Sequence, residues 1–304
     1  MNSKEIIKRL IAHDAPERIG YNFHNEHNDI IFTASRRYKN LEKNPYDKWG
    51  IYPELSELSS FKGETRKDIY GNIYGRFNEK TNGECVYGAI QDWEKDEYIL
   101  PESDPEFFKE LKQQNFAGND KFIIATGESI FSSFRDARLM TNALADTIEE
   151  PERVKDFVDR LTEYECEVIR SISGCGIDGW MLWDDWGTED RTFISPNSFR
   201  ELFKPAYHRL AQAAHEAGMS IILHSCGYIY DFMEDLIEAG IDVFQFDQPD
   251  NYPTEVLVRD FASRVCFYSP VDIQKVLPSG NREMIETRAK EMCELFRSAG
   301  GEAG

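Results

Sequence analysis

The 304-residue sequence lacks several features that assign a protein to a class at once. It has no run of 18 or more apolar residues, and its start, Met1–Glu5, lacks the apolar core of a secretory signal. No GxGxxG or GxxxxGK(S/T) motif occurs, which removes the usual nucleotide-binding patterns. There is no internal repeat and no low-complexity tract. These absences favour a cytoplasmic globular protein with no membrane partner.

Positive charge and closely spaced cysteines are also scarce. Lys and Arg total 35 against 55 Asp and Glu, so the formal net charge is −20. Because such a chain repels nucleic-acid backbones and the sequence shows no basic patch, we expect no nucleic-acid partner. The six cysteines have no CxxC spacing and are expected to be reduced thiols rather than a disulfide framework. They are Cys85, Cys166, Cys175, Cys226, Cys266 and Cys293.

What the sequence does contain, from about residue 120 onward, is a regular alternation of strand and helix patterns. Strands are predicted at 121–126, 179–184, 219–224, 242–246 and 264–269. Helices are predicted at about 150–172, after Ser195, before Gly240, at 253–262 and at about 281–298. This alternation predicts an α/β fold with a parallel sheet, within a single domain that spans 1–304.

The first 120 residues are less regular. A helix is predicted at 2–14 and a first strand at 18–23. From about 28 to 120 the chain is irregular and rich in aromatic residues, and we expect an insertion there. Within it, the segments 68–76 and 85–90 predict a β-hairpin, and 105–115 predicts a helix.

Polar residues follow or end four successive predicted strands. In chain order they are Asp184 and Asp185, then His224 and Cys226, then Asp247 with Gln248, and then Asp272. Barrels build their sites from many strand ends at the C-terminal face, whereas an open sheet uses mainly its switch point. The pattern therefore favours a closed (β/α)8 barrel.

The most informative stretch is SIILHSCG, residues 220–227. Three apolar residues predict a buried strand, and Gly227 allows the chain to turn out of it. His224 and Cys226 are two apart, so their side chains point to the same side. Such a pair is a metal site, a reactive pair, or a buried histidine beside a small cysteine, and the residues alone leave these open.

Several stretches of the chain resemble the uroporphyrinogen decarboxylase superfamily, which includes corrinoid (cobalamin)-dependent methyltransferases as well as the haem-pathway decarboxylase. They are 8–18, 221–227, 235–240, 242–248 and 271–278. The resemblance implies a (β/α)8 TIM-like barrel with its site at the C-terminal mouth. The sequence ends at Gly304, where the family would begin an eighth strand, so we expect a barrel that lacks its last strand or is closed differently.

Within the superfamily, the chain resembles the methyltransferase branch. The decarboxylase branch binds a polycarboxylate through arginines just after the first strand, and here no arginine follows the predicted first strand until Arg36 and Arg37. In corrinoid methyltransferases, a pair like His224 and Cys226 binds zinc together with a later cysteine. The resemblance implies methyl transfer between a small methylated substrate, a methoxylated aromatic or a methylamine, and a corrinoid carried by a partner protein.

The resemblance also implies roles for particular residues. His224 and Cys226 would be zinc ligands, and Asp184, Asp185 and Asp247 are the candidates for a third ligand or a catalytic carboxylate. Trp183, Trp186 and His24 are candidates for a substrate- or corrin-facing wall. The later cysteine ligand has no counterpart, because Cys266 and Cys293 are expected to be buried in the core.

Two other functions stay open at this stage. One is a metal-free decarboxylase of a tetrapyrrole, in which a carboxylate such as Asp184 would stabilise a protonated pyrrole. The other is a non-catalytic binding subunit. Metal content discriminates between these and the methyltransferase, and the sequence leaves the methyl donor and the oligomeric state undecided, with a homodimer as one option.

Overall fold

The structure is a computed structural model that describes residues 1–23 and 27–299. Six parallel strands form one curved sheet in the order β1-β5-β6-β7-β8-β9. Their bounds are β1 Ile30–Thr33, β5 Phe122–Thr126, β6 Gly179–Trp183, β7 Ser220–His224, β8 Val243–Gln245 and β9 Cys266–Tyr268. Among the described residues β1 and β9 are the two edges, so the sheet is the wall of a (β/α) barrel that is open between them.

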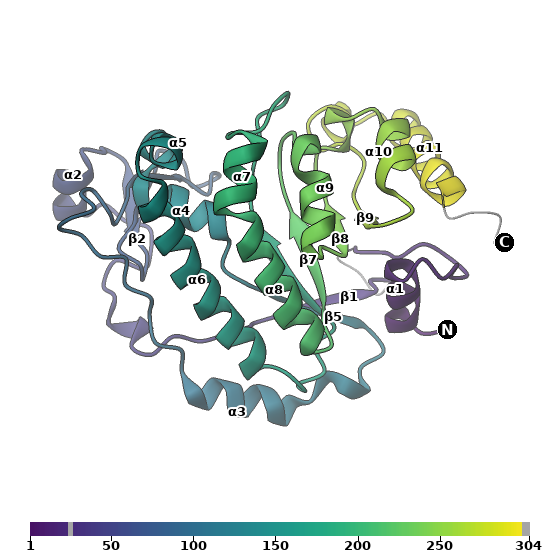
Figure 1. The fold of residues 1–304 in the computed structure, drawn as a ribbon, viewed down its shortest axis with the longest axis horizontal. Helices are drawn as coiled ribbons and strands as arrows, with labels where there is room; N and C mark the ends of the chain where they lie inside the picture. Colours follow the sequence, from purple (N-terminus) through teal and green to yellow (C-terminus); the bar gives the residue numbers. More distant parts are fainter. Residues whose placement is uncertain (24–26, 300–304) are drawn as a thin grey trace.

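Helices cover the outer face of this sheet (Figure 1). They are α4 Ile130–Arg138, α5 Met140–Glu149, α6 Pro151–Ser171, α7 Pro196–Leu202, α8 Lys204–Glu216 and α9 Tyr230–Ala239, followed by α10 Thr254–Phe261 and α11 Arg282–Ala299. The main hydrophobic core lies between them and the sheet, where Ile123, Leu182, Leu223 and Phe244 are fully buried. None of the described helices is long and apolar enough to cross a bilayer.

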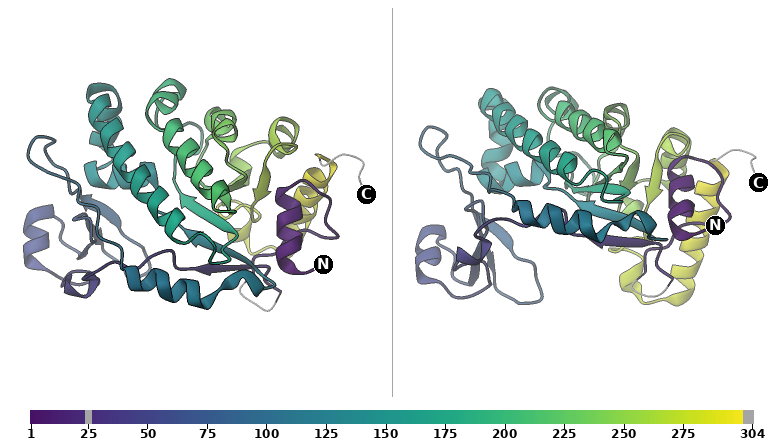
Figure 2. Two further views of the ribbon diagram at one scale, coloured as in Figure 1. Left: turned by 60° about the horizontal axis from the view of Figure 1, so that its bottom comes forward. Right: turned by 90° about the horizontal axis from the view of Figure 1, so that it is seen from below.

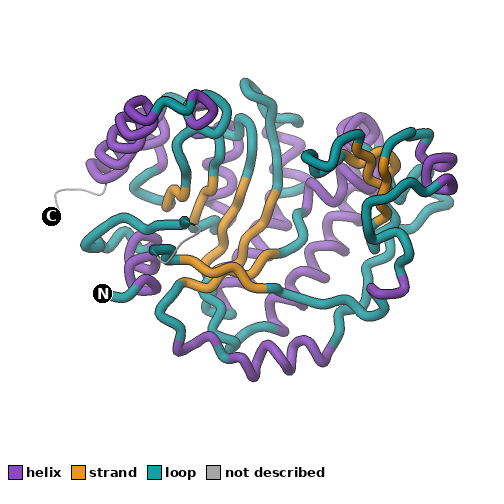
Figure 3. Tube along the Cα trace, turned by 180° about the vertical axis from the view of Figure 1, so that it is seen from behind, coloured by secondary structure: helices purple, strands orange, loops and turns teal. Residues whose placement is uncertain are grey.

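The inner face of the sheet has two layers, as the pairing register shows. The lower layer is apolar and consists of Ile30, Phe122, Ile124, Met181, Ile222 and Val243. Helix α1, Ser3–Ile11, packs against this layer through Ile7 and Ile11. The upper layer, at the carboxyl ends of the strands, contains Trp183, His224, Gln245 and Tyr268. Phe32 and Thr126 lie on the same face, in register with Ile124 and Met181. Figure 3 shows this inner face from behind, with the strands in front of the covering helices.

The insertion between β1 and β5 forms a small separate sheet at one side of the molecule (Figure 2). It contains β2 Glu64–Lys67, β3 Ile73–Arg76 and β4 Glu84–Tyr87, all antiparallel, with α2 Pro53–Ser59 beside them. The predicted hairpin is confirmed as β3 and β4, and the predicted helix at 105–115 is α3, Pro105–Gln114. Strand β2 was not predicted, because its sequence ETRK has no apolar alternation. Short 3-10 turns occur at Leu41–Lys43, Phe116–Gly118, Pro249–Asn251 and Leu277–Ser279.

The expected first strand at 18–23 is wrong, because the first strand of the sheet is β1. Residues 18–23 instead form a loop that is held by a partly buried ion pair. Arg18 donates to both carboxylate oxygens of Asp29 at 2.6 and 2.7 Å, and the Tyr21 amide donates to the same carboxylate at 2.8 Å. Asn22 then hydrogen-bonds the Tyr268 hydroxyl on β9, so this loop joins the two edges of the open wall.

The Arg18–Asp29 pair predicts a pH-dependent contribution to stability. Burial alone would raise the pKa of Asp29, but hydrogen bonds from Arg18 and the Tyr21 amide lower it to about 2. The ionised form therefore stabilises the fold above the ordinary pKa near 3.8, and this contribution is lost as the pH falls through about 2.

We expect Asp29→Asn to lower the free energy of unfolding by about 2 kcal/mol at pH 7. Urea denaturation of both proteins at pH 7 and pH 3 measures this, and the difference should be smaller at pH 3. A difference that is equal at both pH values would contradict the assignment.

Candidate metal centre

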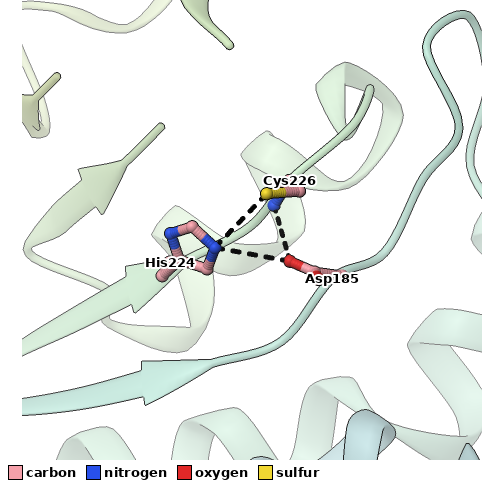
Figure 4. Close-up of side chains that lie close together, drawn as sticks. All are labelled: Asp185, His224 and Cys226. Carbon is pink, nitrogen blue, oxygen red and sulfur yellow. Dashed lines mark hydrogen bonds and ion pairs between the residues drawn. The ribbon is translucent and has the colours of Figure 1, made fainter. Parts of the chain in front are cut away.

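Three potential ligand side chains converge at the carboxyl ends of β6 and β7: Asp185, His224 and Cys226 (Figure 4). Trp183 and His224, the last residues of the two strands, are paired in the sheet, so the residues that follow them emerge side by side. His224 Nε2 lies 3.5 Å from Cys226 Sγ and 3.4 Å from Asp185 Oδ1. Within the described part of the chain, this is the one group of three or more His, Cys, Asp or Glu residues placed to hold a metal ion.

Two glycines hold the loops that carry Asp185 and Cys226 against each other. Gly227 has a φ of +78°, and a Cβ on it would collide with the carbonyl of Gly187. A Cβ on Gly187 would in turn collide with the backbone of Tyr228. The Tyr228 amide donates to the Thr188 carbonyl at 2.6 Å, which closes this backbone contact. Because the two loops touch backbone to backbone, the Cys226 amide can donate to Asp185 Oδ1 at 2.8 Å.

The imidazole of His224 is buried and oriented from β8. Its Nδ1 hydrogen-bonds Gln245 Oε1, and Gln245 Nε2 donates to Asp247 Oδ1 at 2.8 Å. An ionised carboxylate only accepts, so Asp247 fixes which end of the Gln245 amide faces the histidine. When the ring is neutral, as a metal ligand must be, His224 therefore carries its proton on Nδ1 and presents Nε2 to Asp185 and Cys226.

The electrostatics of the cluster favour the charged forms of His224 and Asp185. Burial alone would lower the pKa of His224, but hydrogen bonds with Asp185, Cys226 and Gln245 raise it to about 10. Burial would raise the pKa of Asp185, but the His224 side chain, the Cys226 amide and the Arg135 charge lower it. Without a metal ion, the cluster is thus a hydrogen-bonded ion pair of Asp185 and His224.

Comparison with known families decides the identity of the fold. The model of the uroporphyrinogen decarboxylase (URO-D) family matches residues 121–303, which is more than half of the chain. The chain belongs to the URO-D family. The fold is therefore that of a TIM barrel, and the resemblance seen in the sequence is confirmed.

Among solved structures, the chain is similar to a methyltransferase from Methanosarcina mazei. That structure matches 97% of this chain and 90% of its own, with a TM-score of 0.65 and 15% sequence identity. It shows a shared fold. A lyase/mutase from Burkholderia cenocepacia and a 2,3-dimethylmalate lyase match with TM-scores of only 0.32 and 0.33, at 14% and 10% identity. The former match covers 68% of this chain and 66% of the other, the latter 67% and 60%. No curated protein gave a significant match.

Among the three candidate aspartates of this URO-D member, the structure brings only Asp185 into the cluster. Asp184 is fully buried on the helix side of β6, where it accepts from the amides of Ile130 and Ser132 at 2.9 and 2.8 Å. The Tyr207 hydroxyl donates to it at 2.7 Å. The Asp184 carboxylate therefore caps the N-terminus of α4. Asp247 is not in the cluster: it accepts a hydrogen bond from Gln245, which in turn hydrogen-bonds His224.

The two candidate tryptophans lie on opposite faces of the wall. Trp183 is 42% exposed, and its ring lies 4.7 Å from the ring of His224, on the inner face beside the cluster. Trp186 is fully buried among Phe131, Phe199 and Phe203 in the outer core, so it lines no substrate wall. This corrects the expectation for Trp186. His24, the remaining candidate, lies outside the described residues.

The two later cysteines, Cys266 and Cys293, were both expected to be buried in the core. Cys266 is the first residue of β9, away from the strand ends as expected, but it is only half-buried against the lower apolar layer. Cys293 on α11 is exposed, so the expectation that it is buried is wrong. Neither supplies a further ligand to the cluster.

Sequence reasoning missed two contributors to the site. Gln245 lies opposite His224 in the β7–β8 register, and alternation along the strand would have found it. Arg135 comes from α4 and acts electrostatically on Asp185, a contact between helix and loop that no local pattern indicates.

The donor set fits a zinc ion. Bonds of about 2.0–2.3 Å in a tetrahedral site place ligand atoms about 3.3–3.6 Å apart. The distances of 3.5 and 3.4 Å from His224 Nε2 to Cys226 and Asp185 match this spacing. Three protein ligands leave a fourth position open, which is the arrangement of catalytic zinc sites.

The two neighbouring aspartates are expected to differ in stability. Asp184→Ala leaves two buried amides and a buried hydroxyl without an acceptor, so we expect a loss of about 3 kcal/mol in the free energy of unfolding. Asp185→Ala changes a side chain that is 42% exposed and should cost much less. Urea denaturation measures both, and equal losses would contradict the different roles.

Proposed function

We propose that this protein is a metal-assisted methyltransferase that moves a methyl group from a small methylated substrate to a corrinoid carried by a partner protein. The observation that carries the proposal is the convergence of Asp185, His224 and Cys226 at the carboxyl ends of the strands, where barrel enzymes place their chemistry. Membership in the URO-D family and the shared fold with a methyltransferase support it.

In the proposed reaction, the bond between the methyl carbon and its oxygen or nitrogen breaks. The methyl group passes to the nucleophilic Co(I) of the partner's corrinoid, and the heteroatom left behind takes up a proton. A zinc ion held by Asp185, His224 and Cys226 would supply Lewis-acid assistance to this poor leaving group.

The chain's own residues orient and shield this reaction. Gln245 and Asp247 hold the His224 ring so that Nε2 faces the other two ligands. Trp183 offers an exposed flat surface next to His224, on which an apolar part of the substrate can stack. Tyr268, on the same face of the sheet, is held by Asn22 from the loop that joins the two edges of the wall.

The decarboxylase alternative is less well supported by the residues it requires. Arg36 and Arg37 do follow the true first strand closely, but both are already paired. Arg36, with a side chain 5% exposed, donates to both oxygens of Glu165 at 2.6 and 2.7 Å. Arg37 pairs with Asp104 at 2.9 Å and also with Glu110. Asp184, the candidate partner of a protonated pyrrole, already accepts hydrogen bonds from the first amides of α4.

Metal content tests the proposal. We expect about one zinc per chain in protein purified without chelator, measured by elemental analysis, and its loss in the double variant His224→Ala/Cys226→Ala. Cys293→Ala removes an exposed cysteine on α11 and is the matched control, which should keep the zinc. Zinc absent from the wild type, or retained by the double variant, would contradict the site.

Methyl transfer is the second test of the function. The purified protein, mixed with reduced corrinoid protein or free cob(I)alamin, should methylate the cobalt from a methoxylated aromatic or a methylamine, followed by absorbance. We expect the double variant to lose at least about 100-fold in rate, because it lacks two of the three ligands. A rate unchanged in that variant, or turnover of a porphyrinogen by the wild type instead, would refute the proposal.

A further inference from the structure

The loop between β3 and β4 contains the single Asn-Gly pair of the sequence, Asn82 and Gly83. The residues from 77 to 82 are all exposed. Gly83 has a φ of +73°, a conformation that glycine adopts without steric cost. Because glycine has no Cβ, its main-chain nitrogen is not shielded from the carboxamide of the preceding asparagine. The pair therefore combines a reactive side chain with an accessible peptide nitrogen.

The two asparagines of this loop differ in what their carboxamides contact. Asn78 Oδ1 accepts from the Lys80 amide at 2.9 Å, so the Asn78 carboxamide is held in a local turn. The Thr81 amide and hydroxyl both donate to the Asn78 carbonyl, at 3.1 and 2.9 Å. Within residues 1–23 and 27–299, the Asn82 side chain has no hydrogen-bond partner. The Asn82 carboxamide is therefore free to turn toward the next peptide nitrogen.

Gly83 packs directly against Trp49. A Cβ on Gly83 would lie 2.4 Å from Trp49 Cη2 and 2.8 Å from the carbonyl oxygen of Gly75, so only glycine fits here. The guanidinium groups of Arg76 and Arg66 lie 4.5 and 5.6 Å from the centroid of the Trp49 ring. The main chain at Gly83 thus supports a stack of one indole and two guanidinium groups, here called the Trp49 stack.

We propose that Asn82 is a site of spontaneous deamidation and isoaspartate formation. The Gly83 amide nitrogen attacks Cγ of Asn82, the bond from Cγ to Nδ2 breaks, and Nδ2 leaves as ammonia with the Gly83 amide proton. Water then opens the resulting cyclic succinimide at either carbonyl and leaves aspartate or isoaspartate at position 82. The reaction needs no metal, corrinoid or partner protein, so it goes beyond the proposed function.

The two products are expected to affect the insertion differently. Aspartate adds one negative charge to the net charge of −20 and keeps the main chain as it is. Isoaspartate adds the same charge and also lengthens the main chain by one carbon between Asn82 and Gly83. Because Gly83 has no free space against Trp49 and Gly75, we expect the longer chain to displace Trp49 and to weaken the Trp49 stack.

Peptide mapping by mass spectrometry tests the site. The full-length protein is incubated at pH 8 and physiological temperature, and its tryptic peptides are compared with those of unincubated protein. We expect a gain of about 1 Da in peptide 81–95, which contains Asn82, and none in peptide 77–80, which contains Asn78. The folded protein should react within roughly 10-fold of the rate of a synthetic peptide 81–95, because only the backbone of about one residue has to rearrange.

Three variants separate the reaction from its consequence. Asn82→Gln should abolish the mass gain, because glutamine would have to close a larger ring, and Asn78→Gln is the matched control that should leave the gain unchanged. Asn82→Asp carries the new charge without the longer main chain. Trypsin should therefore cleave the isoaspartyl fraction of the incubated protein faster at Arg66 and Arg76 than it cleaves folded Asn82→Asp.

Circular dichroism verifies that each variant is folded. No mass gain in peptide 81–95 of the protein after the synthetic peptide has reacted, an equal gain at Asn78, or a gain that persists in folded Asn82→Gln would overturn the site. Equal tryptic cleavage of the isoaspartyl fraction and Asn82→Asp would overturn the predicted effect on the Trp49 stack.

Discussion

The backbone contact between the loops after β6 and β7 is the constraint on which the site depends. The strands pair in parallel so that Trp183 lies opposite His224, and the chain then turns twice at glycines that admit no side chain. Because Gly187 and Gly227 touch, Asp185 and Cys226 are brought within hydrogen-bonding distance of each other's loops. The three potential ligands therefore occupy fixed positions before any metal binds, which is the preorganisation that a catalytic site requires.

Two adjacent aspartates connect this site to the rest of the fold. Asp185 faces the inner side of the wall and joins the cluster, while Asp184 faces the outer side and caps α4. The same strand end thus orients the ligand set and the helix that carries Arg135. The insertion sheet holds that arginine from the other side, through Tyr74 and Asp136. Helix, strand end and insertion consequently form one unit around the site.

Much of the regular fold was predictable because its strands are continuous apolar runs. Strands β5 to β9 and helices α6, α10 and α11 were predicted within a few residues, whereas α4 and α5 were not given bounds and α7 and α8 were predicted as one helix. The polar residues at the predicted strand ends identified His224 and Cys226. The period of two that paired these residues also applies to β6, where Trp183 and Asp185 lie inside and Asp184 and Trp186 outside. If this alternation had been extended past the strand end, it would have predicted which aspartate and which tryptophan face the inside of the wall.

Other features depend on contacts that no local pattern encodes. Strand β1 was missed although its sequence IIFT is strand-like, and the loop before it, which the Arg18–Asp29 pair holds, was predicted as the first strand instead. With β1 at its true place, Arg36 and Arg37 do follow the first strand, and only their pairing with Glu165, Asp104 and Glu110 argues against a polycarboxylate site. That pairing involves residues more than 60 positions away in the sequence. Arg135 belongs to the same class, since only the packing of α4 over β6 brings it to the site.

X-ray absorption spectroscopy of the zinc-loaded protein tests the central claim, that Asp185, His224 and Cys226 form a metal centre, most directly. The account predicts one sulfur at about 2.3 Å and nitrogen or oxygen neighbours at about 2.0–2.1 Å in the first coordination shell. It also predicts the multiple-scattering signature of a single imidazole. A shell of oxygen and nitrogen alone, or one with two or more sulfur atoms, would contradict the assignment.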